Sequence, residues 1–103
     1  MKNYQIIFSI ESREDLISIQ NHIYQDSQSH TIADNFVINL YETLISSLPN
    51  FPHKHPVHNK NIRKFTFPRY TNYNAYFEID EENERLVVLA ITASRQFTRY
   101  MKF

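Results

Sequence analysis

The sequence predicts a single α+β domain over residues 1–103 with the element order β-α-α-β-β-β. Three observations predict it: an apolar segment rich in β-forming residues comes first, two stretches with helical spacing follow, and three strand-like runs come last. A chain of 103 residues supports one modest hydrophobic core. We therefore expect two antiparallel helices packed on one face of a mostly antiparallel four-stranded sheet.

The first strand and the first helix are predicted from the start of the chain. Residues 4–10 are apolar and rich in β-formers, which predicts the strand. Ser12 is expected to begin the helix, with Glu14 and Asp15 in the first turn, where the helix dipole favours negative charge. The helix is expected to fade in the polar residues 26–29. Its apolar positions recur at helical spacing: Leu16, Ile19 and Ile23.

The second helix has the most regular apolar pattern in the chain. Ser29 or Thr31 is expected to cap it, and Pro49 is expected to end it, because proline disfavours helical geometry in the preceding residue. The short connector predicts an antiparallel hairpin with both apolar faces on one support. The predicted stripe consists of Ile32, Ala33, Phe36, Val37, Leu40, Tyr41, Leu44, Ile45 and Leu48.

The second half of the chain predicts a loop and three strands. Residues 50–59 contain two prolines and three histidines and are expected to form a loop. Residues 62–67 and 73–79 alternate between two faces, and an acidic turn at 80–84 leads to the apolar run 86–91, a predicted central strand. Four aromatic residues on alternating positions are expected in the core: Phe65, Phe67, Tyr73 and Phe77.

Composition excludes several classes of site. The chain has no cysteine, which excludes disulfides and thiolate zinc sites, and no glycine, which excludes glycine-rich phosphate-binding loops. No run approaches the ~18 apolar residues of a membrane span, and an acidic cluster follows the first strand too early for a signal peptide. We expect a cytoplasmic protein that needs no cofactor and makes no membrane contact.

Charge is unevenly distributed although the net charge is zero. Residues 1–50 carry two basic and six acidic side chains, whereas residues 51–103 carry nine basic and five acidic ones. A basic surface on the second half would suit nucleic acid or an acidic partner, and ordinary solvated charge is the alternative.

The order and spacing of these segments resemble the RelE/ParE superfamily, the toxins of type II toxin–antitoxin systems that include plasmid stabilisation proteins. The resemblance covers nearly the whole chain, and no single motif in it is highly specific. It rests on these runs: Asp15-Leu16-x-x-Ile19-x-x-x-Ile23, Ala33-x-x-Phe36-x-x-x-Leu40-x-x-x-Leu44, Leu48-Pro49, Ile62-Arg63-Lys64-Phe65, Tyr73-x-x-Tyr76-Phe77-Glu78-Ile79-Asp80 and Val87-Val88-Leu89-Ala90-Ile91 followed by Arg95.

The resemblance implies a bacterial growth inhibitor that a cognate antitoxin wraps and silences in a hetero-oligomer, using helix or strand contacts. Two activities occur within the family. ParE-like members inhibit DNA gyrase, whereas RelE-like members bind the ribosome and cleave mRNA with several basic residues and often a tyrosine. A degenerate member that only binds its partner is a third interpretation.

Departures from the ribonuclease pattern favour the ParE-like interpretation. Asn74 stands where RelE-like toxins have an arginine, and Ala93 stands where many members have a histidine. Arg63 and Lys64 stand where those toxins carry lysines, and Arg95 matches the C-terminal arginine of the family. Each missing charge-stabilising or proton-transfer group typically lowers a phosphoryl-transfer rate by ~10²-fold or more. We therefore expect binding to a target rather than cleavage of RNA.

The candidate binding residues follow from the basic half and the resemblance. For contact with a target or an antitoxin they are Arg63, Lys64, Arg69, Arg95, Arg99 and Tyr100. In the ribonuclease alternative the catalytic candidates are Arg95, Tyr100, Arg63 and Lys64. The apolar tail at 94–103 is compatible with packing on the body or with exposure until a partner covers it.

The histidines in the 50–59 segment form one further pattern. His53, His55 and His58 could ligate zinc or nickel, but Lys54 and two prolines lie among them and no acid is close in sequence. We favour a solvated loop over a metal site.

Overall fold

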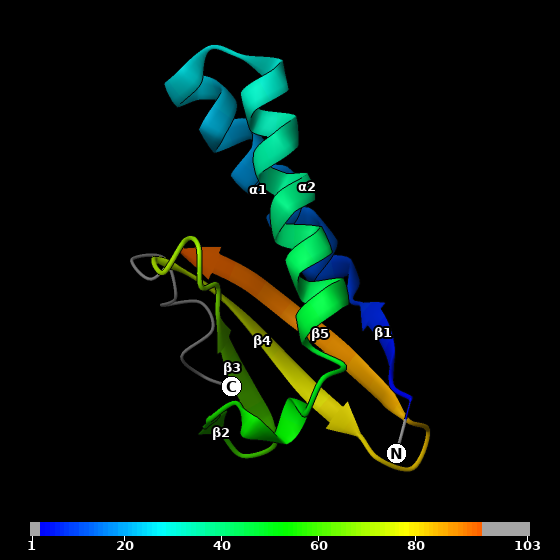
Figure 1. Ribbon diagram of the computed structural model, residues 1–103. Coiled ribbons are helices and arrows are strands. Elements are labelled where there is room, and N and C mark those ends of the chain that lie inside the picture. The colour runs from blue at the N-terminus through cyan, green and yellow to red at the C-terminus, as the bar shows by residue number, and fades with distance from the viewer. Residues whose placement is uncertain (1–2, 94–103) are drawn as a thin grey trace.

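The computed structural model describes residues 3–93 and contains two helices, one short 3-10 helix and five strands (Figure 1). The elements are β1 (Gln5–Phe8), α1 (Ile10–Ser27), α2 (His30–Ser47), η1 (Pro52–Lys54), β2 (Val57–Asn59), β3 (Ile62–Thr66), β4 (Tyr73–Asp80) and β5 (Arg85–Ala93). The predicted α+β class is confirmed. Within residues 3–93, no helix is long and apolar enough to cross a membrane.

The five strands form one sheet in the order β1-β5-β4-β3-β2. β1 pairs with β5 in parallel, and the other pairs are antiparallel, so the expected mostly antiparallel sheet is confirmed. The expected count of four strands is wrong, because β2 forms within residues 50–59, which were expected to be a loop. Val57 pairs with Arg63 and Asn59 with Ile62, across an irregular register. Three residues are too few for an alternating pattern to appear in the sequence.

Serine side chains cap the start of each helix in the hairpin. α1 begins at Ile10, and the Ser9 hydroxyl accepts a hydrogen bond from the backbone N–H of Ser12 at 3.1 Å. The expected helix start at Ser12 is therefore wrong, since Ser12 is fully buried inside the first turn. Gln28 adopts a left-handed conformation with φ of 57°, and Ser29 caps α2. Only two residues separate the helices, which makes them antiparallel, as expected.

α1 continues along the edge of β5 where β1 ends. Beyond Phe8, the Ser9 hydroxyl donates to the backbone oxygen of Leu89 at 3.1 Å. The Asp15 carboxylate accepts a hydrogen bond from the backbone N–H of Ile91 at 2.9 Å. These two side chains supply hydrogen bonds that a neighbouring strand would otherwise provide. Asp15 is therefore buried. It was expected in the first turn of the helix, but it lies beyond that turn.

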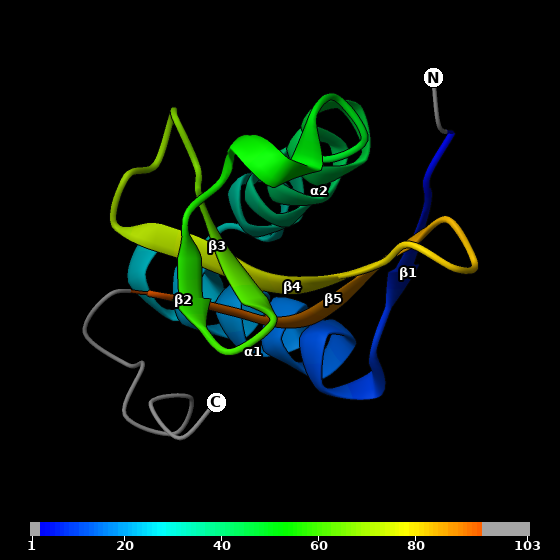
Figure 2. The ribbon, with the colours of Figure 1, turned by 90° about the horizontal axis from the view of Figure 1, so that it is seen from below.

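The core lies between the hairpin and the sheet, and Figure 2 shows α2 along one side of β4 and β5. Leu40, Leu44 and Leu48 of the predicted stripe are fully buried. They share one cluster with all four aromatic residues predicted for the core, Phe65, Phe67, Tyr73 and Phe77. That prediction is confirmed.

The predicted stripe of α2 is wider than the surface that covers it. Ile32, Tyr41 and Ile45 were expected on the buried face, but they are 54%, 45% and 42% exposed. Their positions lie at the margins of the stripe, and the sheet covers only its centre. α2 therefore presents apolar side chains to solvent as well as to the core.

Candidate functional site

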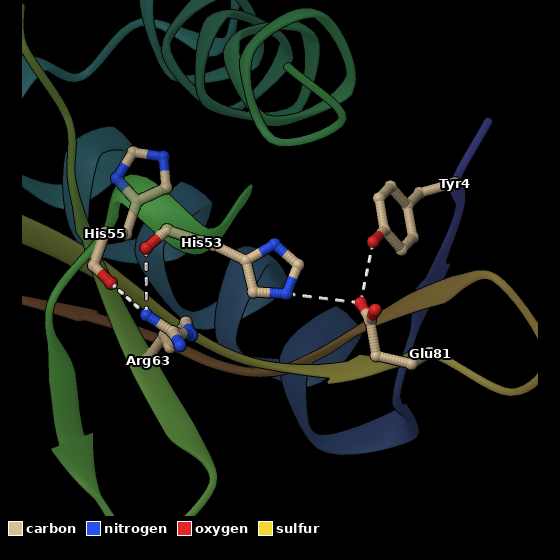
Figure 3. A network of polar contacts seen from close by, with 5 residues as sticks. All are labelled: Tyr4, His53, His55, Arg63 and Glu81. Carbon is tan, nitrogen blue, oxygen red and sulfur yellow. Dashed lines mark hydrogen bonds and ion pairs between the residues drawn. The ribbon is translucent and has the colours of Figure 1, made fainter. Parts of the chain in front are cut away.

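Arg63 is held by the loop that precedes β2. Its guanidinium Nη1 donates to the backbone oxygens of His53 at 3.0 Å and His55 at 2.7 Å (Figure 3). The side chain is half-buried. In the free protein Arg63 thus stabilises the path of the chain from η1 into β2.

Lys64 faces the opposite side of the sheet, because consecutive strand residues alternate between faces. Arg63 shares a face with Phe65, which lies in the core, whereas Lys64 pairs in register with Tyr76. The sheet therefore separates these two cations. We call the side of the sheet away from the core the outer face; on β3, β4 and β5 it comprises Ile62, Lys64, Thr66, Asn74, Tyr76, Glu78, Asp80, Arg85, Val87, Ala90 and Thr92.

The middle of the outer face is apolar. Ile62, Tyr76 and Ala90 form a buried cluster, and the imidazole of His58 packs on the Tyr76 ring with centroids 4.8 Å apart. Burial raises the pKa of the Tyr76 phenol. Tyr76 is therefore neutral at physiological pH and unsuited to act as a base.

Positive charge is sparse on the outer face among the residues that the structure describes. Arg85 forms an ion pair with Asp80 at 3.1 Å near the turn between β4 and β5. Lys64 is the other cation. Asn74 stands where RelE-like toxins have an arginine. It is buried, and its side-chain oxygen accepts a hydrogen bond from the Thr66 hydroxyl at 2.9 Å. The described part of this face has one unpaired cation to offer a phosphate.

The remaining predicted binding residues are dispersed or lie beyond the described range. Arg69 is exposed in the segment that joins β3 to β4. Arg95, Arg99 and Tyr100, with the whole 94–103 tail, lie outside the described residues, so their role in binding stays a prediction.

The three histidines of the 50–59 segment have separate environments. His53 Nε2 lies 3.2 Å from Glu81 Oε1 (Figure 3), the His55 ring packs edge-on against Phe65 with centroids 5.0 Å apart, and His58 lies on the outer face. Across residues 3–93 no group of three or more histidine, cysteine or acidic side chains is arranged to hold a metal ion.

His55 is the histidine with the most unusual surroundings. Its ring packs against Phe65 and Phe77, and no described group hydrogen-bonds its buried Nε2 atom. Burial lowers the pKa of His55, and the positive charges of Lys54 and Arg63 lower it further. The imidazole is therefore neutral at physiological pH and serves as a packing group.

An apolar groove of about 190 Å³ runs between α1 and α2. We call it the hairpin groove; it is lined by Leu16, Ile17, Gln20, Val37, Ile38 and Tyr41. Ile17 and Ile38 are 57% and 51% exposed. Contiguous exposed apolar side chains mark sites of protein interaction. This surface was not predicted from the sequence, although isoleucines on the side of each helix away from the predicted stripe were its signal.

Solved structures share this architecture. A chain of the chromosomal ParDE toxin–antitoxin system of P. aeruginosa aligns with a TM-score of 0.74 at 18% identity, covering 88% of this chain and 96% of that one. This chain has the RelE/ParE fold. The RelE/ParE fold accounts for nearly all of the described residues, as the sequence resemblance implied.

Two further structures have the same RelE/ParE fold. The RelBE2 toxin–antitoxin complex of Mycobacterium tuberculosis contains a chain with a TM-score of 0.65 at 16% identity, covering 88% of this chain and 98% of that one. The isolated E. coli RelE toxin gives 0.53 at 13% identity, covering 96% of this chain and 93% of that one. No protein-family model and no curated protein matches the sequence.

Proposed function

We propose that this protein is the toxin of a type II toxin–antitoxin pair, which inhibits growth in the bacterial cytoplasm until a cognate antitoxin binds it. The observation that carries the proposal is the RelE/ParE fold, shared over 88% of this chain with a member of a ParDE system. The resemblance in sequence pattern supports it independently of the backbone comparison.

The chemistry of the outer face favours binding to a target over cleavage of RNA. An in-line attack on a phosphodiester needs a base and several cations around the developing charge. Here Lys64 is the unpaired cation among the described residues of the outer face, Asn74 is neutral, and Tyr76 is buried with a raised pKa. DNA gyrase, the target of ParE-like members, is the proposed target.

The hairpin groove is the proposed contact for the antitoxin. Its exposed isoleucines suit the apolar side of a helix laid across α1 and α2. Glu14, Asp34 and Glu42 are exposed on the same two helices.

Tightly regulated expression of the chain alone tests the function. Growth should stop, and a reporter plasmid should lose supercoiling while cellular mRNA remains intact. Unimpaired growth would contradict the toxin proposal, and mRNA cleavage that precedes any change in supercoiling would support the ribonuclease alternative instead.

A pair of neighbouring substitutions tests the antitoxin contact. Ile17→Asp places a charge in the hairpin groove, whereas Ser18→Asp places one on an exposed position turned away from it. With the antitoxin co-expressed, cells carrying Ile17→Asp should remain inhibited, and those carrying Ser18→Asp should grow. Equal rescue of the two variants would exclude the groove as the contact.

A further inference from the structure

A second cavity lies on the opposite end of the molecule from the hairpin tip. It has a volume of about 400 Å³ and lies between the beginning of β1 and the segment that joins α2 to β2. This volume falls within the range of small-ligand sites. Its lining is mostly apolar and consists of Asn3, Tyr4, Pro49, Asn50, Phe51, Pro52 and His53.

Phe51 gives this cavity an exposed aromatic wall. Its side chain is 74% exposed, and its backbone adopts a left-handed conformation with φ of 54° and ψ of 62°, which is costly for a bulky residue. Pro49 and Pro52 restrict the backbone on both sides, and the backbone N–H of Lys54 donates to the Phe51 oxygen at 3.0 Å. The backbone that carries the ring is therefore restrained before any ligand binds.

One carboxylate is fixed beside the cavity by two of its lining residues. The Tyr4 hydroxyl donates to Glu81 Oε1 at 2.6 Å, and His53 Nε2 lies 3.2 Å from the same oxygen (Figure 3). The Glu81 side chain is half-exposed, and Glu82 and Glu84 are exposed in the same turn. Among residues 3–93, no lysine or arginine lines the cavity. The site thus combines aromatic and proline surfaces with a neighbouring acidic turn.

We propose that this cavity binds an arginine side chain presented by a partner polypeptide. The aliphatic part of an arginine would pack on the prolines, and its planar guanidinium would stack on Phe51 or Tyr4 while facing the acidic turn. A nucleic acid is disfavoured because its phosphates would meet Glu81 and its neighbours. Arginine is also among the side chains that dominate protein interfaces. This inference does not depend on the toxin function.

Titration of the labelled full chain with capped single amino acids tests the proposal by NMR. N-acetyl-arginine amide should shift the signals of Tyr4, Phe51 and His53 in a saturable way, and added salt should weaken the effect. The lysine analogue should bind more weakly, and the citrulline analogue, which is neutral and of the same shape, should not bind. Equal binding of arginine and citrulline, or no saturable shift, would overturn the proposal.

Variants of exposed residues complete the test. Phe51→Ala removes the aromatic wall and Glu81→Gln removes one charge, and each should weaken arginine binding by about fivefold, the change expected for loss of ~1 kcal/mol. Val57→Ala, a matched change at a 54% exposed position outside the cavity lining, should leave binding unchanged. If Phe51→Ala binds arginine as well as the parent chain does, the cavity is not the site.

Discussion

Asp15→Ala should destabilise the fold strongly although the residue is an acid on a helix. The change removes the acceptor that lies 2.9 Å from the Ile91 backbone N–H, and the buried amide is then left without it. Loss of a hydrogen bond to a charged group, with the penalty for an unsatisfied amide, amounts to about 2–3 kcal/mol. For a domain of this size, that loss lowers the melting temperature by roughly 10–20 °C.

Thermal and urea denaturation of three variants would measure this effect. Asp15→Asn keeps an acceptor oxygen and should lose less stability than Asp15→Ala. Glu14→Ala, at the exposed neighbouring position, should change stability by less than about 0.5 kcal/mol. Similar losses in Asp15→Ala and Glu14→Ala would show that α1 does not stabilise the edge of β5 through this carboxylate.

Three further predictions concern the core, pH and the C-terminal segment. Leu40→Ala should cost about 2–5 kcal/mol in urea denaturation because Leu40 is fully buried, whereas Asn39→Ala should cost less than about 0.5 kcal/mol; equal costs would refute the assigned helix phase. Because the folded pKa of His55 lies below its unfolded value of 6.5, the stability present above that pH should fall as the pH drops toward the folded value. The difference between the urea midpoints at about pH 7.5 and about pH 5.5 should therefore be smaller in His55→Leu than in the parent chain. An unchanged difference would exclude His55 as the cause of the pH dependence. Arg95→Ala should relieve growth inhibition with little change in melting temperature. Arg95→Lys should restore the inhibition only in part, since a point charge cannot reproduce the bidentate hydrogen bonding of a guanidinium. Undiminished inhibition by Arg95→Ala would remove Arg95 from the site.

Periodicity predicted the elements whose side chains alternate between core and solvent. Apolar residues repeat every two positions in the strands and every three to four positions in the helices. These repeats predicted the order of the elements and the burial of Phe65 and Phe77. β2 could not be predicted in this way, because its pairing depends on β3 rather than on its own side chains. Ser9 and Ser12 are both capable of capping a helix, and only the contact with Leu89 distinguishes them.

The candidate surfaces were harder to predict than the fold. Composition indicated a basic half, but the alternation of β3 directs Arg63 and Lys64 to opposite faces. Asp15 was assigned to the helix dipole, and its spacing of four residues from buried Ile19 was the sign of an inward position. The hairpin groove arises where two helices meet, so no single segment of sequence contains it.

The parallel pairing of β1 with β5 determines when the sheet can form. Ser9 and Leu89 are 80 residues apart, whereas two residues separate the helices of the hairpin. Contacts that are local in sequence form early, and distant ones wait until a long loop closes. On the ribosome the hairpin can therefore assemble while β1 still lacks its neighbour, with Leu40 and Leu44 uncovered. A chain interrupted before residue 85 has no partner for β1, so translation of the last strand marks the time at which the complete sheet can first form.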